Sequence, residues 1–287
     1  MIGVFDSGYG GLAVLRKLVD SLPEYSFTYL GDNAREPYGS CTEEEIFQFT
    51  QAGAEYLFDH GCEIVLLLCN TVSAAALRRI QQEFLPNQHP KNRVLGILVP
   101  VIETITGIPW GSPVRVRLFG AKDRVVAVLG TEATVRSQIY TKAIRRHDPN
   151  IEVVEYACPE LTSSLVAEDT EAEIRVALKK CLRGLAEKMD HAGITTPPDS
   201  VLLGCTHFAL IKDLVRQELP QNVELISQGR IVAENFKYYL QRHSEINSKL
   251  DQQGRRRFLT TGDPKVVNRL GSLYFGEEIK FEPVKID

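Results

Sequence analysis

The chain has 287 residues, of which 44% are hydrophobic and 24% are charged. This composition is typical of a globular protein with a substantial core and excludes a disordered chain. The balance of 33 lysines and arginines against 37 acidic residues gives a formal net charge of −4, so we expect no basic face of the kind that binds nucleic acid.

The first residues, 1–5, predict a buried strand, because no basic leader precedes an apolar stretch of signal length. The longest apolar runs, 64–69 and 97–102, fall short of the ~20 residues that span a bilayer. The chain has six cysteines without CxxC spacing, so we expect thiols in a reducing cytoplasm rather than disulfides or a zinc site. These cysteines are Cys41, Cys62, Cys69, Cys158, Cys181 and Cys205.

Short runs rich in Val, Ile and Leu alternate with longer segments of helical period. This pattern predicts an α/β fold of βα units around mostly parallel sheets. We expect strands at 2–5, 27–30, 63–68, 94–98, 125–129, 151–156, 200–203, 223–226 and 257–260. We expect helices at 12–19, 42–60, 73–84, 134–146, 170–192, 209–219, 230–241 and 264–274, the second opening on a capping box of Thr42 and Glu45 and ending at Gly61.

The stretch 106–124 is rich in turn-forming glycine and proline. It predicts a loop or a crossing between two lobes that begins near Val99 and Pro100. A second candidate loop covers 193–199. The run 64–71 resembles 201–207, because each is an apolar strand that ends at a cysteine. Each lobe is therefore expected to present a similar strand end.

Ligands of open parallel sheets bind at the carboxyl ends of the strands. Four segments occupy such positions, namely 6–11, 31–40, 69–71 and 205–207. The cluster Gly8, Gly10 and Gly11 is not a dinucleotide fingerprint, because Ala13 stands where the third glycine is needed. We favour a tight turn whose N–H groups approach a small carboxylate over a nucleotide site, and a purely structural turn is the alternative.

Cys69 and Cys205 are the candidates for proton transfer. Inverting an amino acid at Cα needs a base on one face and an acid on the other, which two thiols in facing lobes can supply. His207 lies two residues after Cys205, so in an extended backbone both side chains point the same way. Asp6 can assist Cys69 from a neighbouring strand end. The alternatives are buried inert thiols, a helix N-cap at Asp6 and a structural role for His207.

Over nearly its whole length the chain resembles the glutamate racemases of the aspartate/glutamate racemase superfamily. The resemblance lies in specific motifs. They are 4–12 (VFDSGYGGL), 29–32 (YLGD) with 37–39 (PYG), 69–74 (CNTVSA), 129–131 (LGT) with 133–135 (ATV), and 203–208 (LGCTHF).

The resemblance implies two α/β lobes related by a pseudo-twofold axis, the first formed by 1–99 and 229–287 and the second by 100–228. It implies a cytoplasmic enzyme that interconverts L- and D-glutamate without metal or other cofactor and supplies D-glutamate for peptidoglycan. Cys69 and Cys205 would exchange protons with Cα, assisted by Asp6 and His207. The substrate-binding residues would be Asp6, Ser7, Tyr38, Gly39, Asn70, Thr71, Thr131, Thr134, Thr206 and His207. For partners we expect the small-molecule substrate glutamate, no nucleic acid, no membrane and a homodimer.

One departure concerns the acid that borders the family's site. Gapless alignment after Ala157-Cys158-Pro159 puts Val166 where a glutamate belongs, and Glu168 can substitute if the loop shifts by two residues. The segment 113–122 looks like an added loop near the lobe crossing. The rival hypotheses are a racemase for aspartate or another small acid, a catalytically degenerate binding or regulatory protein, and a redox protein that uses the two cysteines.

Overall fold

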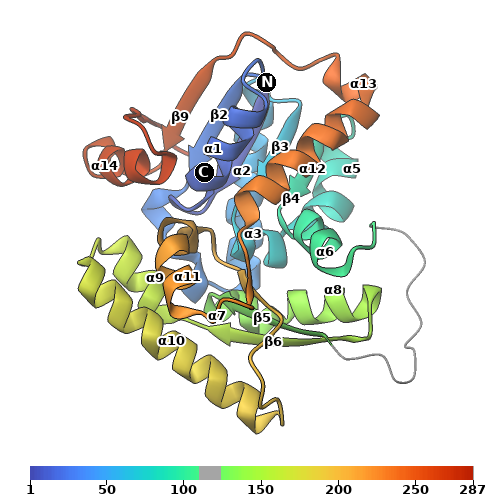
Figure 1. The fold of residues 1–287 in the computed structure, drawn as a ribbon. Coiled ribbons are helices and arrows are strands. Elements are labelled where there is room, and N and C mark those ends of the chain that lie inside the picture. The colour runs from blue at the N-terminus through green and yellow to red at the C-terminus, as the bar shows by residue number, and fades with distance from the viewer. Residues whose placement is uncertain (110–123, 287) are drawn as a thin grey trace. The chain divides into compact units, whose positions relative to one another are not determined.

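The structure is a computed structural model that describes residues 1–109 and 124–286 (Figure 1). The chain forms two compact units. Unit 1 comprises Met1–Ile97 and Gly229–Asp287, and unit 2 comprises Leu98–Gln228. The chain therefore crosses between the units twice, after Ile97 and after Gln228. The added loop expected at 113–122 lies outside the described residues.

Unit 1 contains a sheet of six parallel strands in the order β10-β9-β2-β1-β3-β4. In this sheet Asp6 lies opposite Gly31, and Phe5 lies opposite Leu67. The segments that follow the three central strands therefore meet at one edge. The strands are β1 (Ile2–Asp6), β2 (Phe27–Gly31), β3 (Ile64–Leu67), β4 (Arg93–Gly96), β9 (Arg256–Thr260) and β10 (Glu282–Pro283).

Helical segments connect these strands. The capping box predicted from Thr42 and Glu45 is confirmed: the Thr42 hydroxyl accepts from the Glu45 N–H, while the Glu45 carboxylate accepts from the Thr42 N–H. Two reciprocal hydrogen bonds satisfy N–H groups that a helix start otherwise leaves unpaired. The helical segments are α1 (Gly11–Ser21), η1 (Asn33–Arg35), η2 (Tyr38–Ser40), α2 (Glu43–Asp59), α3 (Asn70–Ala75), α4 (Leu77–Arg79), η3 (Ile80–Phe84), α5 (Leu85–Gln88), α12 (Gln228–Arg242), α13 (Ser244–Asn247) and α14 (Pro264–Phe275).

Unit 2 contains a sheet of four parallel strands in the order β6-β5-β7-β8. Figure 1 shows α8 on one side of this sheet and α10 on the other, and both helices pack against β6. The strands are β5 (Arg124–Gly130), β6 (Ile151–Ala157), β7 (Ser200–Leu203) and β8 (Glu224–Ile226). The helical segments are α6 (Leu98–Thr106), α7 (Glu132–Ser137), α8 (Ile139–His147), α9 (Pro159–Val166), α10 (Glu171–His191), η4 (Thr206–Ile211) and α11 (Lys212–Glu218).

The two units repeat one topology. The order β2-β1-β3-β4 in unit 1 matches the order β6-β5-β7-β8 in unit 2, strand for strand along the chain. The predicted α/β class with parallel sheets flanked by helices is confirmed. In this repeat β3 corresponds to β7, so the strands that precede Cys69 and Cys205 hold equivalent places.

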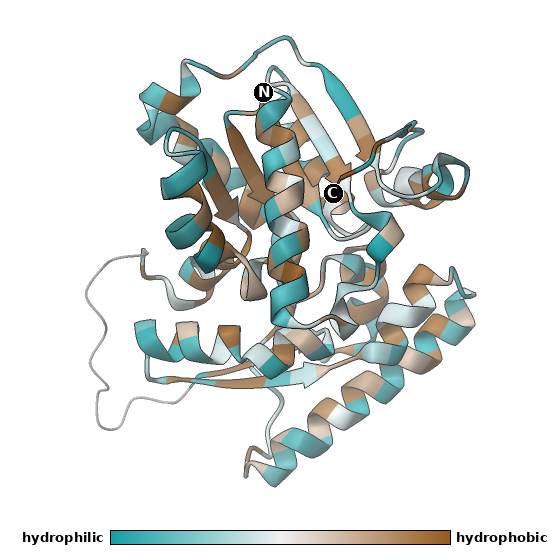
Figure 2. Cartoon of the chain, turned by 180° about the vertical axis from the view of Figure 1, so that it is seen from behind, coloured by the Kyte–Doolittle hydropathy of each residue, from teal (hydrophilic) through white to brown (hydrophobic). Residues whose placement is uncertain are grey.

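Each unit has its own hydrophobic core. Figure 2 shows apolar residues concentrated on the strands and polar residues on the outer sides of the helices. In unit 1 the core gathers side chains such as Phe5, Leu57 and Val65, and in unit 2 it gathers Leu129, Leu178 and Val201. Strands that are buried on both faces explain why the sequence shows continuous apolar runs instead of alternation.

Three predicted elements differ from the structure: two predicted helices are broken, and one predicted strand ends early. The helix expected at 73–84 begins earlier, at Asn70, and is broken into α3, α4 and the π-helical η3. The helix expected at 134–146 is interrupted at Gln138, whose φ of 54° is left-handed. The strand expected to reach Leu98 ends at Gly96. Where a loop or a crossing between lobes was expected, the chain crosses between the units after Ile97 and helix α6 begins at once, with Pro100 in its first turn, where the ring fits.

The expectation that all six cysteines are thiols is also wrong. Cys158 and Cys181 form a disulfide, with their Cα atoms 5.5 Å apart. It joins the start of α9 to α10, which pack against each other. Cys41, Cys62, Cys69 and Cys205 are free thiols. No sequence pattern reveals this pair, because a 23-residue separation becomes a contact only once two helices pack.

Candidate active site

The Cys69 thiol lies at the carboxyl end of β3. Cys69 is extended, with φ −119° and ψ 132°, and it is the N-cap residue of α3. Its side chain is 7% exposed. The Ser7 hydroxyl donates a hydrogen bond to Sγ at 3.2 Å. Ser7 follows β1, the neighbour of β3 in the sheet, so the parallel register brings the two side chains together.

The Asp6 carboxylate is buried at the end of β1. Its Oδ2 accepts the N–H of Gly11 at 2.8 Å and lies 2.9 Å from the Tyr29 hydroxyl, which is also 2.8 Å from the Gly8 carbonyl oxygen. Burial, together with the negative charge of Asp6, raises the pKa of Tyr29 well above its ordinary value, so the phenol stays a donor. Asp6 thus accepts a hydrogen bond from Gly11, the first residue of α1, although the N-cap residue of that helix is Gly10.

The glycine turn is explained by close approach. A Cβ at Gly11 would lie 2.8 Å from Asp6 Cγ, and a Cβ at Gly8 would lie 2.0 Å from Glu36 Oε1. Both distances are shorter than side chains tolerate, so only glycine lets the Asp6 and Glu36 carboxylates lie against this backbone. The backbone of this turn therefore lies against two of the protein's own carboxylates, those of Asp6 and Glu36. The sequence had predicted only a turn whose N–H groups approach a carboxylate of a ligand.

Tyr38 lies on η2 beside Gly39, directly after a cis peptide bond between Glu36 and Pro37. Its hydroxyl donates to Asp32, whose other oxygen accepts from the Thr261 hydroxyl at 2.7 Å. Burial and the Asp32 charge raise the pKa of Tyr38. The tyrosine is thereby fixed in the first unit near the end of β2.

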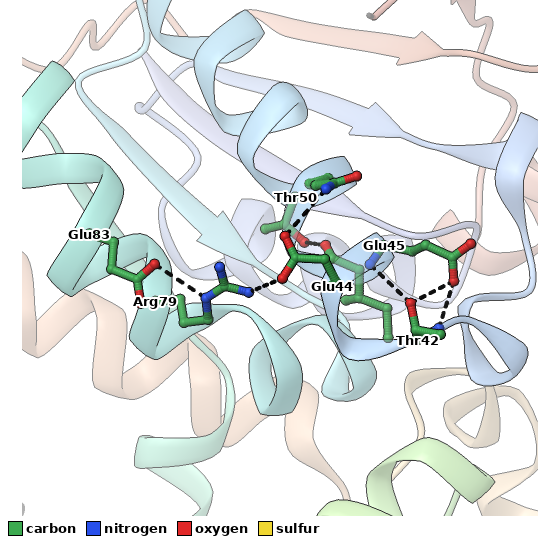
Figure 3. A network of polar contacts seen from close by, with 8 residues as sticks. Thr42, Glu44, Glu45, Thr50, Arg79 and Glu83 are labelled. Carbon is green, nitrogen blue, oxygen red and sulfur yellow. Dashed lines mark hydrogen bonds and ion pairs between the residues drawn. The ribbon is translucent and has the colours of Figure 1, made fainter.

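Asn70 and Thr71 are the first two residues of α3, and both side chains are buried. Beyond them the chain is braced against α2 by Arg79 (Figure 3). The Arg79 guanidinium contacts Glu44 at 2.6 Å and Glu83 at 3.3 Å, and it lies 3.7 Å from the ring centroid of Phe47. This contact joins α2 to the helical segments that follow Cys69.

The Cys205 thiol lies at the carboxyl end of β7 and is 4% exposed. Cys205 is extended, with φ −132° and ψ 132°. His207 Nδ1 lies 3.6 Å from the Cys205 sulfur. An extended backbone through both residues was expected from the sequence, but the 3-10 helix η4 begins at Thr206. The contact is therefore made by a turn, and the buried Thr206 lies within it.

Thr131 follows β5 and caps α7. Its hydroxyl accepts the N–H of Thr134 at 3.2 Å and lies 3.0 Å from the Thr134 hydroxyl. Thr134 is fully buried. In the repeated topology β5 corresponds to β1, so Thr131 occupies the place that Ser7 holds in unit 1. The structure thus places the unit 2 candidates at one sheet edge with Cys205.

Val166 is the last residue of α9, and Glu168 follows with a left-handed φ of 58°. Both side chains are partly exposed. A left-handed backbone at a residue other than glycine costs about 1–2 kcal/mol. The strained backbone at Glu168 therefore lies in the segment where this chain departs from the family's motif.

The structure brings the candidates together in two groups, one in each unit. Asp6, Ser7, Tyr38, Gly39, Asn70 and Thr71 lie with Cys69 in unit 1, while Thr131, Thr134, Thr206 and His207 lie with Cys205 in unit 2. Within the described residues, no cluster of three or more His, Cys, Asp or Glu side chains has the arrangement of a metal site. Nor is any helix of residues 1–109 and 124–286 long and apolar enough to cross a membrane.

Two tyrosines near the candidate residues were not predicted from the sequence. Tyr29 stood inside a quoted motif, where it was a strand residue and not a partner of Asp6. Tyr140, on α8, stood in no motif, and its ring lies beside Gly204, the residue before Cys205. A buried tyrosine must find a hydrogen-bond partner, and that partner is known only once the topology is known.

Comparison with known proteins places the chain in a class. The model of the Asp/Glu/hydantoin racemase family matches residues 2–235. The chain therefore belongs to this family of racemases, which are isomerases. The family predicted from the motifs is confirmed.

Individual relatives agree over the full length. A glutamate racemase of Phenylobacterium zucineum is 39% identical, covering 98% of this chain and 99% of the relative, and one of Caulobacter sp. (strain K31) is 40% identical with the same coverage. Among solved structures, glutamate racemase from Bacillus anthracis has a TM-score of 0.83 at 29% identity, covering 99% of this chain and 97% of that one. Glutamate racemase from Francisella tularensis in complex with D-glutamate has a TM-score of 0.81 at 26% identity, covering 100% and 97%.

Proposed function

We propose that the protein interconverts L- and D-glutamate by a two-base mechanism in which Cys69 and Cys205 are the proton-transfer groups. The observation that carries the proposal is the matched placement of the two cysteines. Each follows the equivalent strand of a repeated sheet, each is extended and buried, and each sulfur has a polar neighbour at 3.2 Å or 3.6 Å. A structural cysteine needs none of these features.

The chemistry conserves atoms and charge. One cysteine, as thiolate, takes the α-proton and becomes a thiol, and the other, as thiol, donates its proton to the opposite face of the carbanion and becomes a thiolate. The reverse reaction exchanges the roles. Ser7 donates to the Cys69 sulfur and so stabilises its thiolate, with Asp6 as a second helper, while His207 assists Cys205. The proposal invokes no metal and no cofactor.

The substrate's carboxylates and ammonium group need donors and acceptors that converge on the cysteines. We propose Asp6, Ser7, Tyr38, Gly39, Asn70 and Thr71 in unit 1, and Thr131, Thr134, Thr206 and His207 in unit 2. These residues supply six hydroxyls, one amide, one imidazole, one acid and the backbone of one glycine near strand ends, the usual place of ligands in parallel sheets.

The second candidate function is racemisation of aspartate or another small acid, and the observation that favours it is Val166 in place of the family's glutamate. We favour glutamate because both named relatives at 39% and 40% identity are glutamate racemases, with Glu168 supplying the acid. Circular-dichroism assays with each amino acid separate the two. Turnover of aspartate exceeding that of glutamate would overturn the assignment.

In the cell we propose that the enzyme acts in the cytoplasm as a homodimer and supplies D-glutamate for peptidoglycan. This role follows from the proposed reaction. Complementation of a bacterium that requires added D-glutamate tests it, and sedimentation of the purified protein tests the dimer.

The mechanism is tested by incubating L- and D-glutamate in D₂O and following deuterium at Cα. We expect wild type to racemise both enantiomers with incorporation of solvent deuterium, and Cys69→Ala and Cys205→Ala to lose racemisation while keeping the far-ultraviolet circular dichroism of wild type. Cys62→Ala is the matched control, since Cys62 is also a buried free thiol of unit 1. Full racemisation by Cys205→Ala would refute the two-thiol mechanism.

A further inference from the structure

The Tyr140 side chain is fully buried on α8, with 0% exposure. Its hydroxyl accepts a hydrogen bond from the Gln228 amide nitrogen at 2.8 Å. The Gln228 side chain is 3% exposed. Burying an amide and a phenol costs desolvation free energy, and the hydrogen bond between them offsets that cost only while they stay together. The pair therefore holds together two segments that are 88 residues apart in the chain.

Gln228 holds a special place in the chain, because it is the last residue of unit 2 and the first residue of α12. The rest of α12 belongs to unit 1. The other crossing, after Ile97, leads directly into α6, which packs against α8. Helix α8 therefore contacts the unit 2 end of both crossings, α6 by packing and Gln228 by the hydrogen bond of Tyr140.

Tyr140 also borders the residue before Cys205. A Cβ at Gly204 would lie 3.6 Å from Tyr140 Cε2, 2.9 Å from the Leu129 carbonyl oxygen and 2.8 Å from Val128 Cγ1. The Gly204 N–H donates to the same Leu129 oxygen at 2.7 Å. The Tyr140 ring and strand β5 thus enclose the peptide from which Cys205 projects.

The electrostatics agree with this geometry. Burial raises the pKa of Tyr140, and the negative charges of Glu155 and Cys205 add to the effect, while the hydrogen bond from Gln228 opposes it. A charge on Cys205 acts on the phenol more strongly in these buried surroundings than it would in water. Tyr140 remains a neutral phenol beside the thiol.

We propose that Tyr140 is a positioning residue for Cys205: its ring supports Gly204, and its hydroxyl ties that support to Gln228 at the crossing between the units. The assignment of a catalytic role to Cys205 rests on the proposed function. The positioning itself does not, because it concerns only where the thiol is held.

The test compares Tyr140→Phe, which keeps the ring and removes the hydroxyl, with Tyr25→Phe as a matched control. Tyr25 is a buried tyrosine of unit 1 whose hydroxyl donates to the Asn247 amide oxygen at 2.7 Å. Gln228→Leu removes the same hydrogen bond from the other side and keeps the test open if Tyr140→Phe folds poorly. Circular dichroism and urea unfolding confirm the fold of each variant.

Two readouts separate positioning from a general loss of stability. The first is the iodoacetamide alkylation rate of each cysteine, measured by mass spectrometry in one sample. We expect Tyr140→Phe and Gln228→Leu to change the rate at Cys205 at least about 3-fold and to leave Cys69 unchanged. The second is glutamate racemisation, where we expect kcat to fall about 10-fold at nearly constant KM, since small misplacements of a reacting group cost up to ~10² in rate.

The double variant Tyr140→Phe/Gln228→Leu should lose no more than the larger single loss, because both changes remove one bond. Equal changes at Cys69 and Cys205, no change at either, or the same result for Tyr25→Phe would overturn the proposal. If wild type proves inactive on glutamate, the proposed function fails, but the alkylation rates still decide whether Tyr140 holds Cys205 in place.

Discussion

Ser7→Ala tests the support of the Cys69 thiolate. The substitution removes the hydroxyl that donates to the Cys69 sulfur at 3.2 Å and otherwise leaves a methyl group of similar shape. A hydrogen bond to a charged group contributes about 1.5–3 kcal/mol. At about 1.4 kcal/mol per factor of ten, its loss lowers the thiolate population roughly 10-fold to 150-fold.

The rate of alkylation changes less than the population. A less stabilised thiolate is more nucleophilic, with a Brønsted coefficient of about 0.4–0.5, so the rate at Cys69 should fall roughly 4-fold to 15-fold near neutral pH. Mass spectrometry after timed exposure to iodoacetamide measures this rate, with Cys205 as the internal reference. We expect kcat for glutamate to fall in parallel.

Ser73→Ala is the matched control for this experiment. Ser73 is a buried serine of the same helix as Asn70, and its hydroxyl donates to the Leu67 carbonyl oxygen at 3.1 Å, not to the thiol. Its loss should cost about 1 kcal/mol of stability without slowing alkylation. An unchanged rate at Cys69 in Ser7→Ala, or an equal fall in Ser73→Ala, would refute the reasoning.

Three further substitutions probe the surroundings of the site. Burial raises the pKa of Glu155, so the stability that its neutral form contributes is present below the unfolded-state pKa of about 4.3 and is lost as pH rises through the folded pKa. Urea unfolding at a series of pH values should therefore show Glu155→Gln gaining stability relative to wild type as pH rises above about 4.3. Glu168→Gly relieves a left-handed backbone and should raise the free energy of unfolding by about 0.5 kcal/mol, while kcat/KM for glutamate falls. Gly11→Ala puts a Cβ 2.8 Å from Asp6 Cγ and should cost about 1–3 kcal/mol and lower kcat.

Each of these expectations has a contrary result. A stability difference between Glu155→Gln and wild type that is constant with pH would mean that Glu155 does not titrate abnormally. Full activity in Glu168→Gly would remove Glu168 as the replacement for the family's acid. An active and stable Gly11→Ala would show that Asp6 can move without consequence.

The sequence predicted those parts of the site that depend on strand ends. Apolar runs ending at Cys69 and Cys205 sufficed to place each thiol at the carboxyl end of a strand in its own sheet, because the carboxyl ends of the parallel strands of a sheet lie along one edge of that sheet. The capping box at Thr42 was equally local. The residues that form such features lie within a few positions of one another, so the local sequence is enough to predict them.

Contacts between distant segments could not be predicted in this way. The bond from Gln228 to Tyr140 spans 88 residues, and that from Thr261 to Asp32 spans 229. Neither pair has a spacing that signals contact, since only the sheet order brings the segments together. The breaks in the helix after Cys69 were missed for a related reason, because tertiary packing overrides the helical period there.

The two thiols occupy equivalent places in a repeated topology, yet their neighbours differ. Ser7 reaches the Cys69 sulfur from an adjacent strand, and His207 reaches the Cys205 sulfur from the following turn. A hydroxyl can only donate to a thiolate or accept from a thiol, whereas an imidazole can also carry the proton's charge. Under the proposed mechanism, the equilibrium between enantiomers fixes the ratio of kcat/KM in the two directions at unity. The unequal neighbours must therefore express themselves in kcat and KM separately, so Ser7→Ala and substitutions at His207 should shift these constants differently for L- and D-glutamate.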